Sequence, residues 1–105
     1  MNSNAPFSEQ FRLAAETWAD KEAAASILEE TKSAALAKKM SELGDVPVSH
    51  AEREVKASEW WRHYIEKMCA ARAAANLAKI QVEYIRMRYW EQAGHDASKR
   101  AEMRL

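Results

Sequence analysis

Apolar residues recur at helical spacing along the first half of the chain. They stand three, four or seven positions apart, which is typical of a helix that buries one stripe. The pattern begins at Phe7, and Gly44 is a natural residue to follow a last helical turn. We predict a first helix over about residues 7–43. Its apolar face contains Phe7, Phe11, Ala14, Trp18, Ala25, Leu28, Ala35, Leu36, Met40 and Leu43.

The segment GDVPVSH, residues 44–50, is the strongest break in this pattern. Pro47 disfavours a helical conformation at the residue before it. Ser49 and Glu52 then match the S-x-x-E capping box that begins many helices. We therefore predict a turn over residues 44–48, through which two helices fold back antiparallel.

The second helix is expected to be long. It runs from about residue 49 to 93, which corresponds to about 65 Å at 1.5 Å per residue. Gly94 is its first plausible end, and residues 94–105 form a tail or a short helix. Residues 1–105 are then a single helical-hairpin domain of the all-α class.

Two rows of residues on the second helix follow an a/d heptad, the pattern of coiled coils. The first row contains Trp61, Met68, Ala75, Val82 and Tyr89, and the second contains Tyr64, Ala71, Ala78 and Ile85. The alanines make the middle of this seam thin, so another helix can approach closely there. We expect the hairpin core to contain Phe11, Trp18, Leu28, Trp61, Tyr64, Met68, Ala75, Val82 and Ile85.

Charge supports the antiparallel pairing. Residues 1–45 hold eight acids and five bases, a balance of minus three, and residues 46–105 hold eight acids and eleven bases, a balance of plus three. No acidic residue flanks the seam. With the turn as its centre, the hairpin places Asp20 near Arg72, and it places Glu9 near Gln81 and Glu83. Such exposed pairs select a register more than they stabilise the fold.

Two parts of the second helix are left without cover in this register. Residues after about 87 extend past the first helix, and a second apolar row lies opposite the seam. One hairpin cannot bury both faces of a helix, so we expect a homo-oligomer, a dimer or larger, assembled as a helical bundle. The candidate apolar face for an oligomer or a partner contains Leu77, Ile80, Tyr84, Met87 and Tyr89.

The sequence offers little chemistry for catalysis. Glu59, His63 and Glu66 share a helical face, but the chain lacks the Glu-x-x-His pairs of di-iron bundles. Cys69 has no nearby cysteine or histidine and fits a small apolar residue. A glycine-rich phosphate loop, G-x-S-x-G and Cys-x-x-Cys are all absent. We expect a non-enzymatic protein without a metal or a cofactor.

The location of the protein is expected to be cytoplasmic. The first ten residues have neither a basic leader nor an apolar core. No apolar run approaches the roughly 20 residues that span a bilayer, and a single cysteine fits a reducing compartment. Membrane binding is not expected.

Basic and aromatic residues alternate in WWRHY at residues 60–64 and in YIRMRYW at residues 84–90. Basic groups neutralise phosphate and aromatic rings stack on unpaired bases, so single- or double-stranded DNA is a possible partner. Alternatively, the rings belong to the core and the basic groups face water. The candidate contact residues are Arg86, Arg88, Trp90, Lys99, Arg100 and Arg104.

The segment EYIRMRYWEQAGHDASKRAEMRL resembles small helical proteins that phages and prophages encode near recombination genes. The resemblance covers about residues 70–105 and implies an accessory protein in DNA recombination or replication, located in the host cytoplasm. Its target is then nucleic acid or a recombination protein. Two alternatives stay open: a small inhibitor or adaptor that binds a host protein through an apolar helix face, or a structural component that forms bundles.

Overall fold

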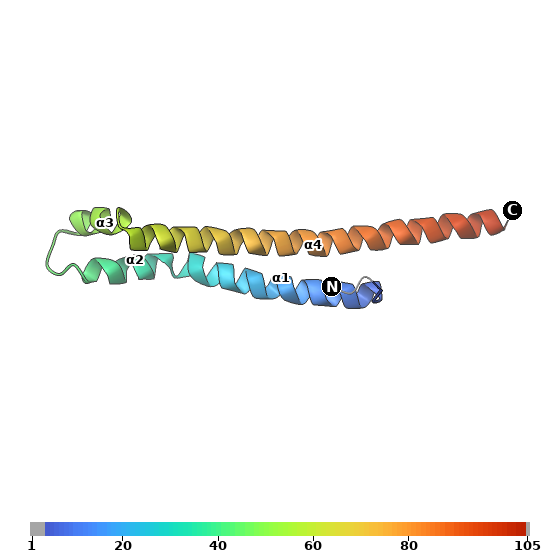
Figure 1. The fold of residues 1–105 in the computed structure, drawn as a ribbon, viewed down its shortest axis with the longest axis horizontal. Coiled ribbons are helices and arrows are strands. Elements are labelled where there is room, and N and C mark those ends of the chain that lie inside the picture. Colours follow the sequence, from blue (N-terminus) through green and yellow to red (C-terminus); the bar gives the residue numbers. More distant parts are fainter. Residues whose placement is uncertain (1–3, 105) are drawn as a thin grey trace.

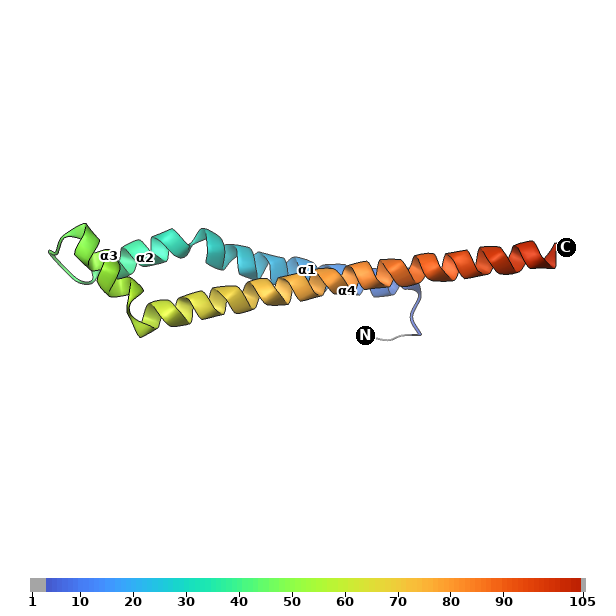
Figure 2. The ribbon, with the colours of Figure 1, turned by 90° about the horizontal axis from the view of Figure 1, so that it is seen from above.

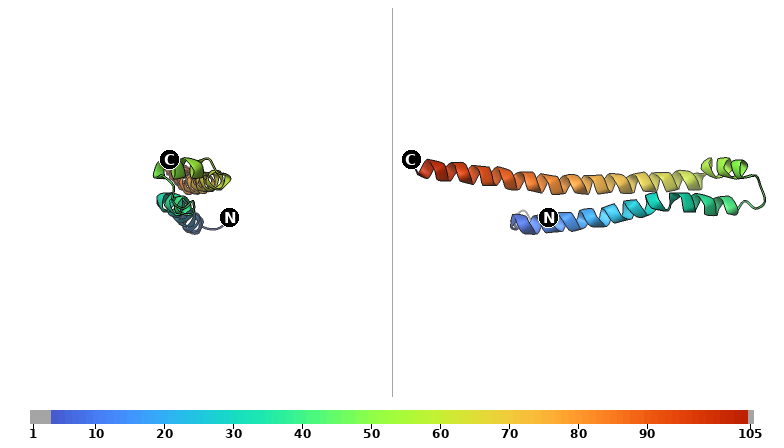
Figure 3. Two further views of the ribbon diagram at one scale, coloured as in Figure 1. Left: turned by 90° about the vertical axis from the view of Figure 1, so that its left-hand side faces the viewer. Right: turned by 180° about the vertical axis from the view of Figure 1, so that it is seen from behind.

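The computed structural model describes residues 4–104, and its fold is all-α, which confirms the predicted class. The long fourth helix runs antiparallel to the first two, and the third lies at the closed end of the hairpin (Figure 1). The molecule is a rod of 84 × 19 × 18 Å, and it is narrow when seen along its length (Figure 3). The helices are α1 (Phe7–Glu30), α2 (Lys32–Ser41), α3 (Val48–Lys56) and α4 (Glu59–Met103).

The prediction of one helix over residues 7–43 is wrong in two respects. The helix is interrupted at Thr31, and its second part ends at Ser41. The Thr31 hydroxyl donates a hydrogen bond to the Ile27 carbonyl at 2.6 Å. The Tyr64 hydroxyl of α4 donates to the Leu28 carbonyl at 2.7 Å. A side chain that bonds to helix carbonyls in this way is a recognised cause of a kink. Figure 2 shows α2 turned away from the line of α1.

The predicted second helix over residues 49–93 is also wrong, because it is two helices. Ser58 is extended, with ψ of 156°, and separates α3 from α4. Its hydroxyl oxygen accepts a hydrogen bond from the Trp61 backbone N–H at 3.2 Å and donates to the Val55 carbonyl at 2.5 Å. The N-cap of the long helix is therefore Ser58, and the continuous heptad gave no sign of it.

The predicted capping box does not form. Helix α3 begins at Val48, with Pro47 as its N-cap residue and no hydrogen bond from a capping side chain. Proline is compatible with a helix start because its fixed φ suits the first turn. The connection that we predicted over residues 44–48 instead occupies residues 42–47, where Gly44 adopts a φ of +81°.

An aromatic cluster occupies the start of α4. The rings of Trp61 and Tyr64 are stacked, with centroids 5.8 Å apart and planes only 4° from parallel. The Lys39 ammonium of α2 lies 5.0 Å from the centre of the Trp60 ring. This cation–π contact ties the end of α2 to the start of the long helix.

Burial on α4 follows the heptad. The buried residues of this helix are Trp61, Ala75, Val82 and Ile85, which all belong to the two predicted rows. Three other expected core residues, Leu28, Tyr64 and Met68, are half-buried. The central cluster consists of Ala14, Val82 and Ile85, with Phe7 and Trp18 packed against it.

The prediction that Phe11 of α1 belongs to the hairpin core is wrong. We expected it in the hairpin core, but 38% of it is exposed, and Gln10 is buried in its place with 2% exposed. The Gln10 amide donates to the Ala5 carbonyl at 2.7 Å, and its oxygen accepts from Arg88 at 3.1 Å. A buried amide whose polar atoms are bonded in this way costs little. An apolar spacing rule overlooks such a residue because it counts only apolar side chains.

The register of the two long helices differs from the predicted one by about one helical turn. Arg72 pairs with Glu22 and Glu29 rather than lying near Asp20. At the open end, the Phe7 and Tyr89 rings meet edge to face at 5.9 Å. The limit of cover near residue 87 was therefore also wrong, because α1 reaches as far as Tyr89.

Gly94 does not end the long helix. Helix α4 continues through it to Met103, so residues 94–103 are part of the same helix and not a separate tail. The residues around Gly94 are mostly good helix formers, and they outweigh one unfavourable position. The segment 91–103, here called the overhang, extends beyond the start of α1 (Figure 1).

Candidate interaction surfaces

A charged clamp joins the middle of α4 to α1. The Arg72 guanidinium donates two hydrogen bonds to the Glu29 carboxylate, at 2.7 and 2.8 Å, and a third to Glu22 at 2.6 Å. The hydrogen bonds from Arg72 hold the pKa of Glu29 below its ordinary value, and the same bonds raise the pKa of Arg72. Fork-shaped pairing of this kind fixes geometry as well as charge. Its role is to hold the register of the hairpin.

Two of the residues predicted to contact nucleic acid, Arg86 and Arg88, also pack against rings of α1. The Arg86 guanidinium lies over the Phe11 ring at 5.6 Å. The Arg88 guanidinium lies over the Phe7 ring at 5.4 Å and also bonds to Gln10. Both arginines therefore cover the open end of the α1–α4 seam. A ligand would have to compete with these contacts to use them.

The most prominent exposed feature is a row of four large apolar side chains on α4. The exposed fractions are 68% for Leu77, 59% for Ile80, 53% for Tyr84 and 60% for Met87. The seam residues of the same stretch, Val82 and Ile85, are buried against α1, so this row points away from the hairpin partner. We call these four residues the outer row. The fifth residue predicted for this face, Tyr89, is 47% exposed and also contacts Phe7 of α1.

The overhang and the two residues that flank it, Trp90 and Arg104, carry the remaining predicted contacts. Trp90 is 65% exposed and meets the Tyr89 ring edge to face, with centroids 5.2 Å apart. Among the described residues 4–104, Lys99, Arg100 and Arg104 form no ion pair. The overhang therefore offers basic groups to solvent, and acidic residues lie among them.

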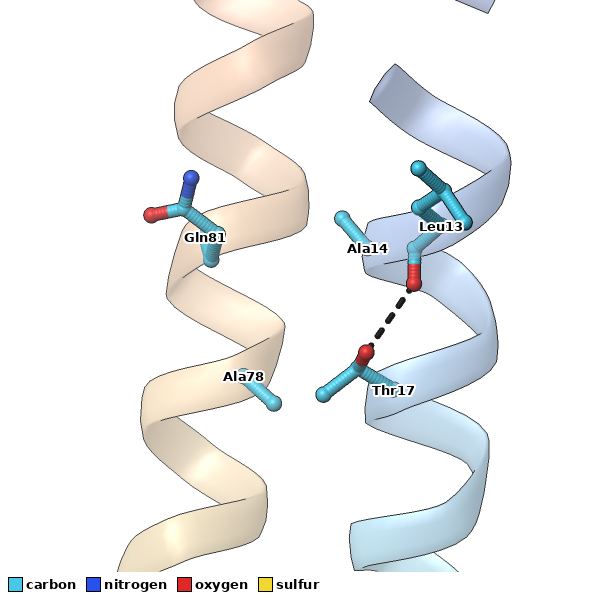
Figure 4. Close-up of a pocket in the computed structure, with 5 residues that line it drawn as sticks. All are labelled: Leu13, Ala14, Thr17, Ala78 and Gln81. Atoms are coloured by element: carbon cyan, nitrogen blue, oxygen red, sulfur yellow. Dashed lines mark hydrogen bonds between the residues drawn. The ribbon is translucent and has the colours of Figure 1, made fainter. Parts of the chain in front are cut away.

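A shallow groove on the side of the hairpin contains no chemistry of its own. It has a volume of about 330 Å³ and lies where two small residues, Ala14 and Ala78, face each other (Figure 4). Leu13, Thr17 and Gln81 complete its lining. The Thr17 hydroxyl already donates to the Leu13 carbonyl at 3.0 Å. The groove thus results from the thin alanine part of the seam.

No ligand set for a metal is assembled within residues 4–104. The two glutamates around His63 lie 3.8 and 3.7 Å from Arg62, between them on the helix, which is the arrangement of an exposed charged face. Cys69 is exposed. In the same part of the chain, none of the helices combines the length and the apolar character needed to cross a membrane.

Comparisons of the chain with protein-family models, with curated proteins and with solved structures found no match. The interaction surfaces described above are therefore the basis for a functional proposal.

Proposed function

We propose that the chain is a non-catalytic accessory protein that binds another protein through the outer row of α4. The observation that carries this proposal is the exposure of four large apolar side chains on one face, each more than half accessible. Contiguous exposed apolar surface on a soluble protein commonly marks an interaction site. The remaining apolar residues of this stretch of α4 are already used by α1.

The spacing of the outer row suits a groove on the partner. Its residues stand at positions i, i+3, i+7 and i+10, which is how an amphipathic helix presents anchors to an apolar groove. Helix α4 is held in place by α1, so it loses little conformational freedom on binding. The resemblance to phage early-region proteins makes a recombination or replication protein a reasonable target.

The test compares two isoleucines of similar exposure. Ile80 belongs to the outer row and is 59% exposed, whereas Ile27 lies on α1 and is 62% exposed. A photo-reactive amino acid is placed at residue 77, and cross-linked proteins are identified from cells that encode the chain. We expect one predominant adduct, lost with Ile80→Glu and kept with Ile27→Glu. Equal capture by both variants, with helical content unchanged, would refute the proposal.

A second candidate function is binding of nucleic acid at the overhang. It is favoured by the exposure of Trp90 and of three basic residues further along the same helix end, Lys99, Arg100 and Arg104, whereas Arg86 and Arg88 also contact rings of α1. Fluorescence anisotropy with labelled single- and double-stranded DNA across a salt series separates the two functions. Phosphate contacts predict affinity that falls log-linearly with salt concentration. Binding through the outer row predicts no DNA affinity.

A further inference from the structure

The overhang repeats the phase of the hairpin seam. Met103 lies eighteen residues after Ile85, which is five turns of 3.6 residues, so both side chains leave the helix in the same direction. Gln92, Asp96 and Lys99 occupy the heptad positions between them. The face that α1 covers along the hairpin therefore continues to the end of α4, but with polar residues on it.

No helix among the described residues 4–104 covers this continuation. Helix α1 begins at Phe7, which lies at the level of Tyr89. The chain has an accessible surface of 7955 Å² and a mass of 12.0 kDa, whereas a compact monomer of that mass exposes about 6,000 Å². The excess of about 2,000 Å² is more than twice the roughly 800 Å² that each partner buries in a standard interface, and the elongated shape of the rod accounts for part of it. The overhang contributes to this excess and includes Met103, at 81% the most exposed of the large apolar residues between 4 and 104.

A groove lies where α1 begins and the overhang starts. Its volume is about 390 Å³, and it is lined by Phe7, Tyr89, Gln92, Ala93, Asp96 and Arg100. It combines two rings from the hairpin seam with polar groups of the overhang. An apolar side chain with a basic neighbour suits this lining, because the rings accept the apolar part and Asp96 accepts the charge.

We propose that the overhang pairs with the overhang of a second copy of this chain, antiparallel and in a single register. In this register, Asp96 of each copy faces Lys99 of the other. The two heptad layers at the centre of the interface therefore each hold one pair of opposite charges. The next layers place Met103 of the second copy against Gln92, beside the Phe7 and Tyr89 rings. The exposed methionine thus enters the groove at the start of α1.

The flanking charges agree with this register. His95 and Glu102 lie on one side of the overhang seam, and antiparallel pairing brings His95 of one copy beside Glu102 of the other. A parallel arrangement in register would instead oppose Asp96 to Asp96 and Lys99 to Lys99, which is unfavourable. Charge therefore distinguishes the two orientations.

The ends of the helices also fit. The C-terminal end of the second copy's α4 arrives close to the N-terminal end of α1, and the two helices continue one another. Opposite ends of two helix dipoles then meet, which is favourable. The result is two hairpins joined end to end in a longer rod, with the apex of each at the outer ends.

A charge-swap series tests the register. Sedimentation equilibrium of the full chain should show a dimer. Asp96→Lys alone and Lys99→Asp alone should each weaken dimerisation about tenfold or more, because each places like charges in both central layers. The double variant Asp96→Lys, Lys99→Asp should return to within about threefold of the original affinity. A chain that stays monomeric up to about 100 µM would overturn the proposal, as would a dimer that is insensitive to the single swaps.

Cross-linking gives an independent readout. In a Cys69→Ser background, cysteines at positions 92 and 103 should form a covalent dimer under mild oxidation, since these positions face each other across the two copies. The matched control moves the second cysteine from residue 103 to residue 97, which lies outside the seam, and should remain mostly monomeric. Equal cross-linking of both pairs would contradict the register.

The outer row gives a separate control. Ile80→Glu should leave this dimer intact although it abolishes capture of a protein partner. If Ile80→Glu dissociates the dimer and the charge swaps do not, the second copy binds the outer row and the overhang proposal fails. Binding of DNA to a monomer, reduced by Lys99→Asp, would also refute it.

Discussion

Two parts of one helix behave differently in this molecule. From residue 59 to 89, the seam of α4 is apolar, and Val82 and Ile85 are 3% and 1% exposed against α1. From residue 91 to 103, the same heptad carries Gln92, Asp96 and Lys99, and no helix within the described part of the chain covers it (Figure 1). The periodicity is common to both parts, and only the residue types on it change.

The two kinds of residue on the heptad suit two kinds of contact: a permanent one along the hairpin seam and a selective one along the overhang. An apolar seam is stabilised by burial in whatever helix completes it, and α1 is always available because it is part of the chain. A polar seam gains little from burial and depends on correct pairing of charges, which sets register and orientation. The hairpin is thus suited to be a constant scaffold, and the overhang is suited to a reversible contact.

The largest expected effect comes from equal truncations in the two parts. Ile85→Ala should lower the free energy of unfolding by about 2–5 kcal/mol, because it leaves a cavity in the core cluster. Met103→Ala should change it by less than about 0.5 kcal/mol, because that side chain is exposed in the single chain. Urea denaturation followed by circular dichroism, at a concentration where the chain is monomeric, measures both. Similar losses for both variants would remove the contrast.

A smaller effect of opposite sign is expected within the overhang. Gly94→Ala should stabilise the local helix by about 0.5–1 kcal/mol, and an added Cβ meets no atom within 4 Å. Amide hydrogen exchange should slow in residues 91–103 and stay unchanged along the seam. Gly44→Ala is the control and should destabilise the connection, because Gly44 has a φ of +81°. Unchanged exchange around residue 94 would mean that the overhang is held by something else.

The smallest effect concerns the Arg72 clamp in the covered part. Arg72 lowers the pKa of Glu29 from its ordinary value of 4.5. A lowered carboxylate pKa stabilises the folded state above the ordinary value, and this stabilisation is lost as the pH falls through the lower, folded value. Thermal melts between about pH 6 and pH 3 should show a smaller loss for Glu29→Gln than for the original chain. Identical pH profiles would show that the clamp contributes nothing measurable.

The local pattern predicted some features well. The long helix and its buried rows follow from apolar spacing alone, because each a/d residue faces the same direction whatever the partner is. The breaks at Thr31 and Ser58 did not follow from that pattern. Both depend on hydrogen bonds of single side chains, from Tyr64 to Leu28 and between Ser58 and Trp61, and the first of these joins residues far apart in the chain.

The interaction surfaces also include one feature that apolar spacing predicted and one that it did not. The outer row was visible as a second apolar face, since spacing alone separates it from the seam. The contacts of Arg86 and Arg88 with rings of α1 could not be predicted from spacing, because they depend on which rings lie opposite the two arginines. Those rings are placed by the register, which differs from the predicted one by about one turn.

The sequence by itself determined that this chain is helical, that it folds back once near its middle, and that its long helix has two apolar faces. These properties are local, since they arise from helix propensity, breakers and periodicity. Tertiary structure alone decided where the helices are interrupted, which glutamates meet Arg72, and how far α1 extends along α4. The break at Ser58 rests on hydrogen bonds to nearby residues, whereas the other features depend on contacts between residues distant in the chain. The energy differences between neighbouring registers are small enough for single hydrogen bonds and ion pairs to select one.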